Sequence, residues 1–204
     1  MRAVTDLFHD KAADWDQRPV PQQISEGVFA SLQARVPLSP GARVLDFGAG
    51  TGLLASKLAP LVGRLLAVDV SPAMLEQLSR KPELSGKVEI FCQDLLERPL
   101  DQRADVVVSA MAMHHVRDTR GLTRALFAHL EPGGRLALAD LDAEDGSFHP
   151  PGTDGVFHAG FDREALRGLL QEAGFVEIAF ETACEVHREA RAYPVFLVTA
   201  RKPG

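Results

Sequence analysis

The chain has 204 residues, of which 46% are hydrophobic and 25% are charged. These values fit one ordinary globular domain and differ from those of disordered or fibrous proteins. The formal net charge of -6 argues against binding to nucleic acid through overall charge, because phosphate groups attract basic surfaces.

The first residues of the chain are rich in charge and lack the apolar centre of a signal peptide, and no stretch is long enough to span a membrane. We therefore expect a cytoplasmic protein with no membrane or nucleic-acid partner, either a monomer or a homodimer. The two cysteines, Cys92 and Cys184, lie far apart in strand-like segments without ligand spacing, which predicts buried structural thiols.

The first predicted element is an amphipathic helix near the N-terminus. Ile24, Val28, Leu32 and Val36 recur every four residues, so they share one face of a helix. We expect this helix to lie across the open end of a sheet. Residues 1–36 then form a helical cap segment on a main domain of residues 37–204, within one structural domain.

Strand-like and helix-like segments alternate from residue 42 onward. Residues 42–47, 65–70, 87–93, 104–110 and 135–141 are rich in Val, Leu and Ile, whereas residues 53–61, 72–79 and 119–130 have helical patterns. Such alternation predicts a parallel sheet with helices on both faces.

The last third of the chain has a different order of elements. Asp162 and Gly174 bracket a predicted helix, and residues 175–186 and 192–201 then form two strand patterns in succession. These strands predict an antiparallel hairpin at one sheet edge. Before them, residues 142–161 form a long irregular segment, and such segments are often functional.

A glycine-rich turn follows the first predicted strand, at residues 44–52 with the sequence V-L-D-F-G-A-G-T-G. Gly48 and Gly50 have no Cβ, so a ligand can lie against their main chain. The helix after Gly52 would present free N–H groups to an anionic group such as a ligand carboxylate. Asp46, at the end of the strand, would meet an ammonium group.

Two further acidic residues follow the next two predicted strands. Asp69 ends the second strand about twenty residues after the first glycine, where a carboxylate can accept hydrogen bonds from both hydroxyls of a ribose. Asp94 follows the third strand and is placed to bind an adenine amino group, with Leu95 packing on the ring. Together these features predict a nucleoside with an amino-acid tail at the carboxyl edge of the sheet.

The Asp-x-Gly-x-Gly-x-Gly pattern with an acid closing the second strand resembles the cofactor motif of class I S-adenosylmethionine-dependent methyltransferases. The resemblance covers nearly the whole chain. The segments at residues 114–116 and 130–134 and the final hairpin are also similar to the subgroup that includes quinone-biosynthesis methyltransferases.

This resemblance implies an α/β fold, a Rossmann-like doubly wound seven-stranded sheet of order 3-2-1-4-5-7-6 with strand 7 antiparallel. It implies S-adenosyl-L-methionine as cofactor, and a small organic acceptor that receives the methyl group by in-line displacement. The backbone near Ser109 and Ala110 would approach the sulfonium. The cofactor-binding positions are then Asp46, Gly48, Ala49, Gly50, Asp69, Val70, Met74, Asp94, Leu95, Ser109 and Ala110.

Two other functions compete with this interpretation. An NAD(P)-dependent oxidoreductase would share the fold, but its fingerprint is G-x-G-x-x-G, whereas Gly48, Gly50 and Gly52 follow at two-residue steps, and no Tyr-x-x-x-Lys pair occurs. A non-catalytic module that only binds S-adenosylmethionine is the third alternative. Turnover of labelled cofactor separates the three.

The candidate catalytic residues are histidines, because an alcohol, phenol or acidic carbon needs a general base. They are His114 and His115 after the fourth predicted strand, and His149 and His158 in the loop after the fifth. For His114 a packing or hydrogen-bonding role is favoured over catalysis, and His115 is similarly ambiguous.

The loop of residues 140–161 holds several features that suggest an acceptor site. Its four carboxylates at Asp140, Asp142, Glu144 and Asp145 would receive a cationic or polyhydroxylated acceptor, or form only a solvated acidic loop. An aromatic pocket of Phe148, Phe157 and Phe161 is expected, with Trp15 covering it. Asp140, Asp142, His149 and His158 include potential metal ligands, but no fixed ligand spacing supports them, so no metal is predicted. The acceptor and the methylated atom stay open.

Overall fold

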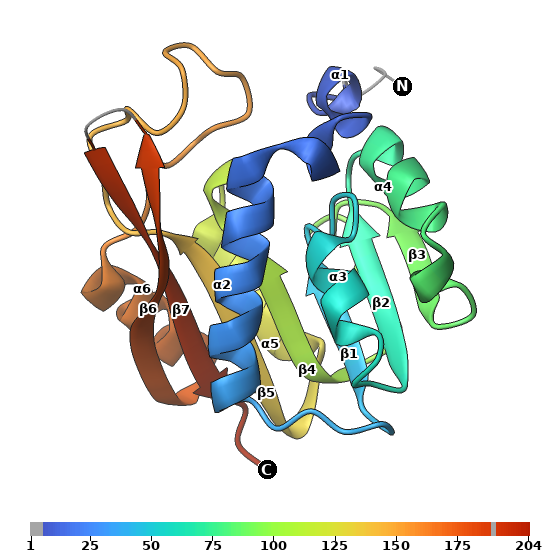
Figure 1. The fold of residues 1–204 in the computed structure, drawn as a ribbon. Helices are drawn as coiled ribbons and strands as arrows, with labels where there is room; N and C mark the ends of the chain where they lie inside the picture. Colours follow the sequence, from blue (N-terminus) through green and yellow to red (C-terminus); the bar gives the residue numbers. More distant parts are fainter. Residues whose placement is uncertain (1–5, 189–190) are drawn as a thin grey trace.

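The computed structural model describes residues 6–188 and 191–204, and its centre is one seven-stranded sheet. The strand order is β3-β2-β1-β4-β5-β7-β6, as predicted (Figure 1). Strands β1 to β5 pair in parallel, and β7 is antiparallel to both of its neighbours. The strands are β1 (Arg43–Phe47), β2 (Arg64–Asp69), β3 (Val88–Cys92), β4 (Ala104–Ala110), β5 (Leu130–Leu141), β6 (Val176–Arg188) and β7 (Arg191–Arg201).

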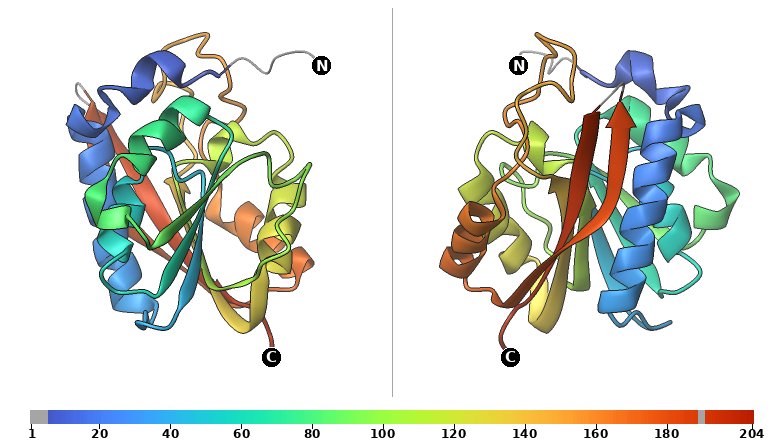
Figure 2. Two further views of the ribbon diagram at one scale, coloured as in Figure 1. Left: turned by 90° about the vertical axis from the view of Figure 1, so that its right-hand side faces the viewer. Right: turned by 60° about the vertical axis from the view of Figure 1, so that its left-hand side comes forward.

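Helices cover both faces of this sheet (Figure 2). One face carries α2 (Pro19–Arg35), α3 (Leu53–Leu58) and α4 (Pro72–Ser79), and the other carries α5 (Thr119–Ala128) and α6 (Arg163–Ala173). The shorter pieces are α1 (His9–Ala12) and the 3-10 turns η1 (Trp15–Gln17), η2 (Pro82–Leu84) and η3 (Met113–His115). In the described part of the chain, no helix has the length and apolar character needed to cross a membrane.

Alternating strand residues build a separate hydrophobic core on each face. Val44 and Val106 pack in the core under α2, α3 and α4, whereas their neighbours Leu45 and Val107 pack in the core under α5 and α6. Because successive side chains of a strand point to opposite faces, strands buried on both sides must be apolar throughout. This requirement explains the continuous apolar runs in the sequence.

Helix α2 lies along a face of the sheet and not across its open end, so that part of the prediction is wrong. It contacts β6, β7 and α3, and buries Ile24, Val28 and Leu32. A Cβ on Gly27 would lie only 2.6 Å from the Cβ of Cys184, which shows how closely α2 approaches β6. The long final hairpin offers an apolar face that the helix covers.

Some predicted details also differ in the structure. The helices predicted at residues 53–61 and 119–130 end at Leu58 and Ala128, and β5 begins at Leu130. Cys92 is exposed, so the prediction of a buried thiol is wrong there, since β3 is an edge strand with one side open. Cys184 is partly buried.

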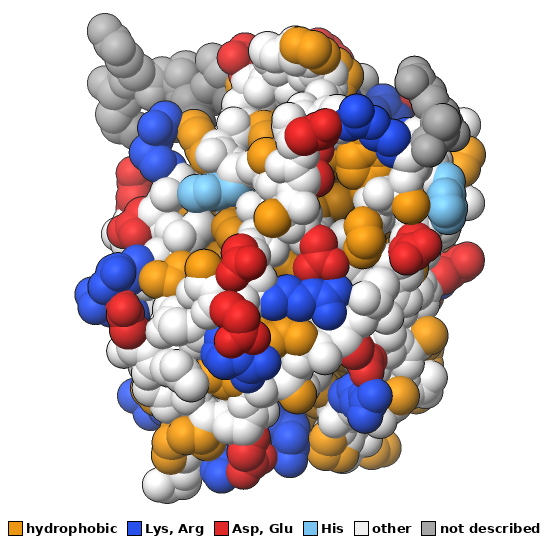
Figure 3. Space-filling view, turned by 90° about the vertical axis from the view of Figure 1, so that its left-hand side faces the viewer, with side chains coloured by type: hydrophobic (Ala, Val, Ile, Leu, Met, Phe, Trp, Pro, Cys, Tyr) orange, Lys and Arg blue, Asp and Glu red, His pale blue; other side chains and the backbone are white. Residues whose placement is uncertain are grey.

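The face with β6 and α6 has a mixed distribution of charge, and Figure 3 shows basic and acidic side chains side by side there. Ion pairs of α6, β6, β7 and the loop after β5 include Arg163 with Asp142, Arg191 with Asp145, and Arg201 with Glu177.

Candidate active site

The glycine-rich turn after β1 has left-handed backbone angles that only glycine adopts readily. Gly48, Gly50 and Gly52 have φ angles of 68°, 55° and 83°. A Cβ on Gly48 would lie 2.2 Å from the Cβ of Ala112, so this glycine is required by protein packing. A Cβ on Gly50 would meet nothing within 4 Å, so the main chain there faces open space that a ligand can fill.

Asp46, near the end of β1, is a buried acid. Its side chain is 2% exposed, and Oδ2 has no hydrogen-bond partner among the described residues. Burial and the neighbouring charge of Asp69 raise the pKa of Asp46 to about 8. Such an acid fits a cationic group of a ligand, because the ligand's charge would offset the cost of burying a carboxylate.

Asp69, at the end of β2, joins the glycine-rich turn to the start of α4. Its Oδ2 accepts a hydrogen bond from the Gly50 N–H, and its Oδ1 accepts one from the Ser71 N–H, both at 2.8 Å. Each carboxylate oxygen has a second lone pair, which leaves two acceptor positions for ribose hydroxyls. Burial raises the pKa of Asp69, and the backbone donors oppose that rise.

The other predicted cofactor positions lie at the same edge, with one difference. Val70 is 57% exposed, so it offers apolar surface beside Asp69. Asp94 is exposed and uses Oδ1 to accept from the Leu96 N–H, which leaves Oδ2 for a ligand. Leu95 is 1% exposed and packs in the core under α5 and α6, so its side chain is not placed to pack on an adenine ring.

The remaining predicted positions serve the local backbone. Ser109 Oγ donates to the Phe47 carbonyl at 2.9 Å and ties the end of β4 to β1. Ala110 is followed by Met111, which has a φ of 57°, so the chain turns sharply where the sulfonium is expected. Met74 is buried, and its N–H donates to the Ser71 cap of α4. Ala49 is also buried and lies between the glycines.

Three of the four candidate histidines form one group, which we call the histidine cluster: His114, His115 and His149. Their ring nitrogens, one from each residue, all lie within 4.8 Å of one another. His114 Nε2 is 3.2 Å from His149 Nε2. The rings of His114 and His115 have centroids 4.0 Å apart.

The two histidines of η3 are held by other groups. His114 is 1% exposed; its Nδ1 is 2.7 Å from Asp140 Oδ1, and its backbone N–H donates to Asp140 Oδ2. His115 Nδ1 is 2.7 Å from the Gly155 carbonyl oxygen. Burial and the nearby His114 lower the pKa values of His115 and His149 to about 4, so both imidazoles are neutral near pH 7.

The fourth candidate, His158, lies outside this cluster. Its Nε2 is 3.0 Å from the Val116 carbonyl oxygen, and its ring packs near Phe161. The potential ligand set of Asp140, Asp142, His149 and His158 is therefore not assembled, because Asp142 forms a bidentate pair with Arg163 instead.

The acidic loop and the aromatic pocket also differ from expectation. Asp145 pairs with Arg191, and Glu144 accepts from the Ser147 and Phe148 N–H groups, so local contacts occupy these carboxylates. Phe148 is buried against His149 and Tyr193, whereas Phe157 is 43% exposed beneath Arg117. The three phenylalanines thus do not line one pocket.

The N-terminal segment lies over the carboxyl edge of the sheet, as does the loop after β5 (Figure 1). Asp16 accepts from Thr51 Oγ at 2.5 Å and pairs with Lys81, and Asp6 accepts from the Ser71 hydroxyl. Phe8 packs edge-on against both His115 and Trp15, so it connects Trp15 to the histidine cluster. Sequence reasoning missed these aspartates, since surface acids carry no pattern.

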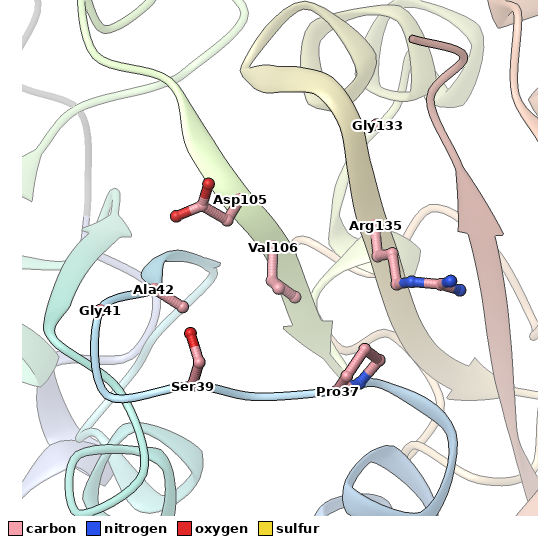
Figure 4. Close-up of a pocket in the computed structure, with 8 residues that line it drawn as sticks. All are labelled: Pro37, Ser39, Gly41, Ala42, Asp105, Val106, Gly133 and Arg135. Atoms are coloured by element: carbon pink, nitrogen blue, oxygen red, sulfur yellow. The ribbon is translucent and has the colours of Figure 1, made fainter.

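A pocket of about 370 Å³ lies at the opposite edge of the sheet (Figure 4). It is formed by the loop before β1 and the first residues of β4 and β5, including Asp105 and Arg135. Neither the glycine-rich turn nor the histidine cluster contributes to it.

Comparison with known proteins supports the interpretation of this site as one that binds S-adenosylmethionine. Residues 44–134 match the family model of a methyltransferase domain. This match begins in β1 and extends into β5, so it includes the glycine-rich turn, Asp69 and the first two cluster histidines. Residues 44–134 of the chain therefore resemble a methyltransferase domain, in agreement with the cofactor motif that they contain.

Two relatives show how far the similarity extends. An uncharacterized methyltransferase of Schizosaccharomyces pombe is 32% identical over 150 residues, which is 65% of this chain and 53% of the relative. A ubiquinone/menaquinone biosynthesis C-methyltransferase of Vibrio vulnificus is 27% identical over 87% of this chain and 81% of the relative. The chain thus spans about half of the first protein and about four-fifths of the second.

The fold is also shared with solved structures. A methyltransferase chain in complex with the Trm112 methyltransferase activator of Haloferax volcanii superposes with a TM-score of 0.82 at 19% identity, over 99% of this chain and 100% of the other. The methyltransferase fold therefore extends over the whole chain.

Proposed function

We propose that this methyltransferase transfers the methyl group of S-adenosylmethionine to a small organic acceptor bound beside the histidine cluster. The observation that carries the proposal is the position of two unlike groups on neighbouring strands. Asp46 lies near the end of β1, and its Oδ2 has no partner among the described residues. His114 follows β4 and contacts Asp140, which lies near the end of β5. The carboxyl edge of the sheet therefore offers an acid that can bind the ammonium group of the cofactor and a histidine that can accept a proton.

Each part of the cofactor has a matching feature of the site. Asp46 would pair with the ammonium group, and the Gly50 backbone would lie against the amino-acid part of the cofactor. Asp69 would accept hydrogen bonds from the ribose hydroxyls. Asp94 has a free carboxylate oxygen for the adenine amino group. The bound cofactor supplies the activated methyl group.

His149 is the residue placed to take the acceptor's proton in the metal-free protein. It is only partly buried and neutral near pH 7, and His114, itself held by Asp140, lies beside it. The acceptor's lone pair would form a bond to the methyl carbon while the carbon–sulfur bond breaks, which leaves S-adenosylhomocysteine. An acceptor with an ionisable hydroxyl suits this arrangement. The names of the relatives in ubiquinone biosynthesis, which include O- and C-methyltransferases, support this acceptor class.

The test is a screen of metabolite pools with methyl-labelled S-adenosylmethionine and mass detection of the product. We expect one small molecule to gain the labelled methyl group. If the protein binds the cofactor but labels no compound in any pool, it is a non-catalytic binding module, and the proposal is wrong. The monomer or homodimer state stays a prediction, which light scattering would check.

A further inference from the structure

The histidine cluster contains the donor atoms of a transition-metal site. Three imidazoles from η3 and from the loop after β5 bring one ring nitrogen each within 4.8 Å of the others. The closest pair, His114 Nε2 and His149 Nε2, is 3.2 Å apart. Two nitrogens that bind one tetrahedral zinc ion at about 2.0–2.1 Å lie about 3.3 Å apart, so this pair already has the required separation.

The second nitrogen of two rings is already occupied. His114 Nδ1 contacts the buried Asp140 carboxylate, and His115 Nδ1 contacts the Gly155 carbonyl oxygen, both at 2.7 Å. Metal-binding histidines almost always donate their other N–H to a carboxylate or carbonyl, which fixes the tautomer and aims the free lone pair. In both rings this leaves Nε2 as the ligand atom.

The charges around the cluster are compatible with a cation. Asp140 is 0% exposed and provides a fixed negative charge behind His114. Two basic side chains also act on His149: Lys11, and Arg188, which stacks on the Phe148 ring and donates to the Phe148 carbonyl, so the Asp140 carboxylate has to offset their charge.

We propose that His114, His115 and His149 bind one divalent transition-metal ion, with Asp140 as the positioning residue behind His114. Three imidazole ligands are typical of zinc sites that keep a fourth, open position. That position would receive water or an oxygen of the acceptor. Metal binding itself does not depend on methyl transfer, but the binding of an acceptor oxygen to the metal rests on the proposed function.

The experiment is a titration of untagged, chelator-dialysed protein with Co²⁺, followed by displacement with Zn²⁺. We expect one equivalent of Co²⁺ per chain, with the strong visible absorption of a tetrahedral ion that Zn²⁺ abolishes. His115→Ala and His149→Ala should each lose this absorption. Asp140→Asn should weaken affinity by about 10–100-fold, the usual effect of removing such a partner. His187→Ala, at a surface histidine outside the cluster, is the matched control.

Calorimetry with S-adenosylhomocysteine, run on each variant, confirms that the fold and the cofactor site are intact. Absence of stoichiometric Co²⁺ binding to the wild type, or wild-type binding by both cluster variants, would overturn the metal proposal. A wild type that binds no Co²⁺ and still methylates an acceptor would overturn it and leave the proposed function standing. A protein that binds the metal but methylates no acceptor would leave the metal proposal standing and overturn the proposed function.

Discussion

Burial of the Asp46 carboxyl destabilises the ligand-free protein, but the same carboxyl can bind the ammonium group of the cofactor. A buried carboxyl without a partner stays protonated well above its ordinary pKa, because a lone buried charge is expensive. The ammonium group of the cofactor would reverse this preference, since an opposite charge nearby favours the ionised form. The residue therefore links the protonation state of the protein to cofactor binding.

The first prediction concerns the pH dependence of the ligand-free protein. The pKa of Asp46 is about 8 in the folded chain, against 3.8 for an ordinary aspartic acid, so the folded state holds the extra proton between these values. Stability should therefore fall as pH rises from about 5 to about 8, by at most about 1.4 kcal/mol for each step of one in pH. Denaturant unfolding at several pH values measures this fall, and Asp46→Asn should flatten it.

The same residue predicts that S-adenosylhomocysteine binds more tightly as pH rises from about 6 to about 8, because Asp46 must ionise to pair with the ligand's ammonium. Asp46→Asn should lose affinity by about 1.5–3 kcal/mol, the scale of a hydrogen bond to a charged group. Calorimetry across this pH range measures both effects. A pH-independent affinity, equal in the wild type and the variant, would show that Asp46 does not meet the ammonium.

Asp69 gives a second prediction at the residue scale. Asp69→Ala should weaken S-adenosylhomocysteine binding by about 1.5–3 kcal/mol, because it removes the ribose acceptor and frees the Gly50 and Ser71 N–H groups. The matched control is Asp105→Ala, which removes an acid that accepts from the Arg43 N–H at the opposite edge of the sheet. Calorimetry should find the control's affinity unchanged, and an equal loss in both variants would mean a general effect on the fold.

At the scale of elements, the strands and helices of the main domain are predictable from the sequence. Buried parallel strands are continuously apolar, and helix boundaries carry local signals such as the Asp162 cap and the left-handed Gly174 at the two ends of α6, both of which the structure confirms. The position of α2 was not predictable, because an apolar stripe shows that a helix is buried without showing against what.

Contacts between elements were predictable only in part. β4 and β5 are neighbours, so the residues after β4 and at the end of β5 must lie close together, and this placement brings His114 to Asp140. The strand order alone was therefore enough to predict that His114 and Asp140 lie close together. The loop of residues 142–161 has no regular structure, so nothing in its sequence separates His149, which joins the cluster, from His158, which does not.

The N-terminal segment gives the prediction at this scale. Asp16 links η1 to Thr51 of the glycine-rich turn and to Lys81 after α4, so it fastens the segment over the cofactor site. Asp16→Ala should weaken S-adenosylhomocysteine binding by about 0.5–1.5 kcal/mol, the net value of a typical hydrogen bond, and should speed proteolysis of the segment. Calorimetry and limited proteolysis measure the two effects.

The matched control is Asp14→Ala, two residues away, because Asp14 pairs with the exposed Arg18 in the same segment. Surface ion pairs of this kind contribute little. If both variants behave like the wild type, the segment does not cover the bound cofactor.

For the whole molecule, the doubly wound sheet places the two halves of the reaction on different strands. The proposed cofactor contacts of Asp46, Asp69 and Asp94 lie at the ends of β1, β2 and β3, and the histidine cluster follows β4 and β5. Since the strand order is β3-β2-β1-β4-β5, the two groups lie on opposite sides of the β1 and β4 boundary. One sheet can therefore hold a constant cofactor site beside an acceptor site with its own chemistry.

The last prediction is that cofactor binding and turnover separate in variants. His149→Ala should keep S-adenosylhomocysteine affinity within about 0.5 kcal/mol of the wild type, because its contacts with His114, His115 and Phe148 involve no predicted cofactor position. Its turnover on the acceptor found by the screen should fall by about 10²–10⁴-fold, the range for loss of a general acid or base. Asp46→Asn should show the opposite pattern, with a smaller rise in melting temperature when ligand is added, since ligand stabilisation follows affinity. Thermal unfolding with and without S-adenosylhomocysteine, run beside turnover assays, gives both readings for each variant. Equal losses of binding in the two variants would mean that the histidine cluster belongs to the cofactor site, and full turnover in His149→Ala would remove it from the acceptor site.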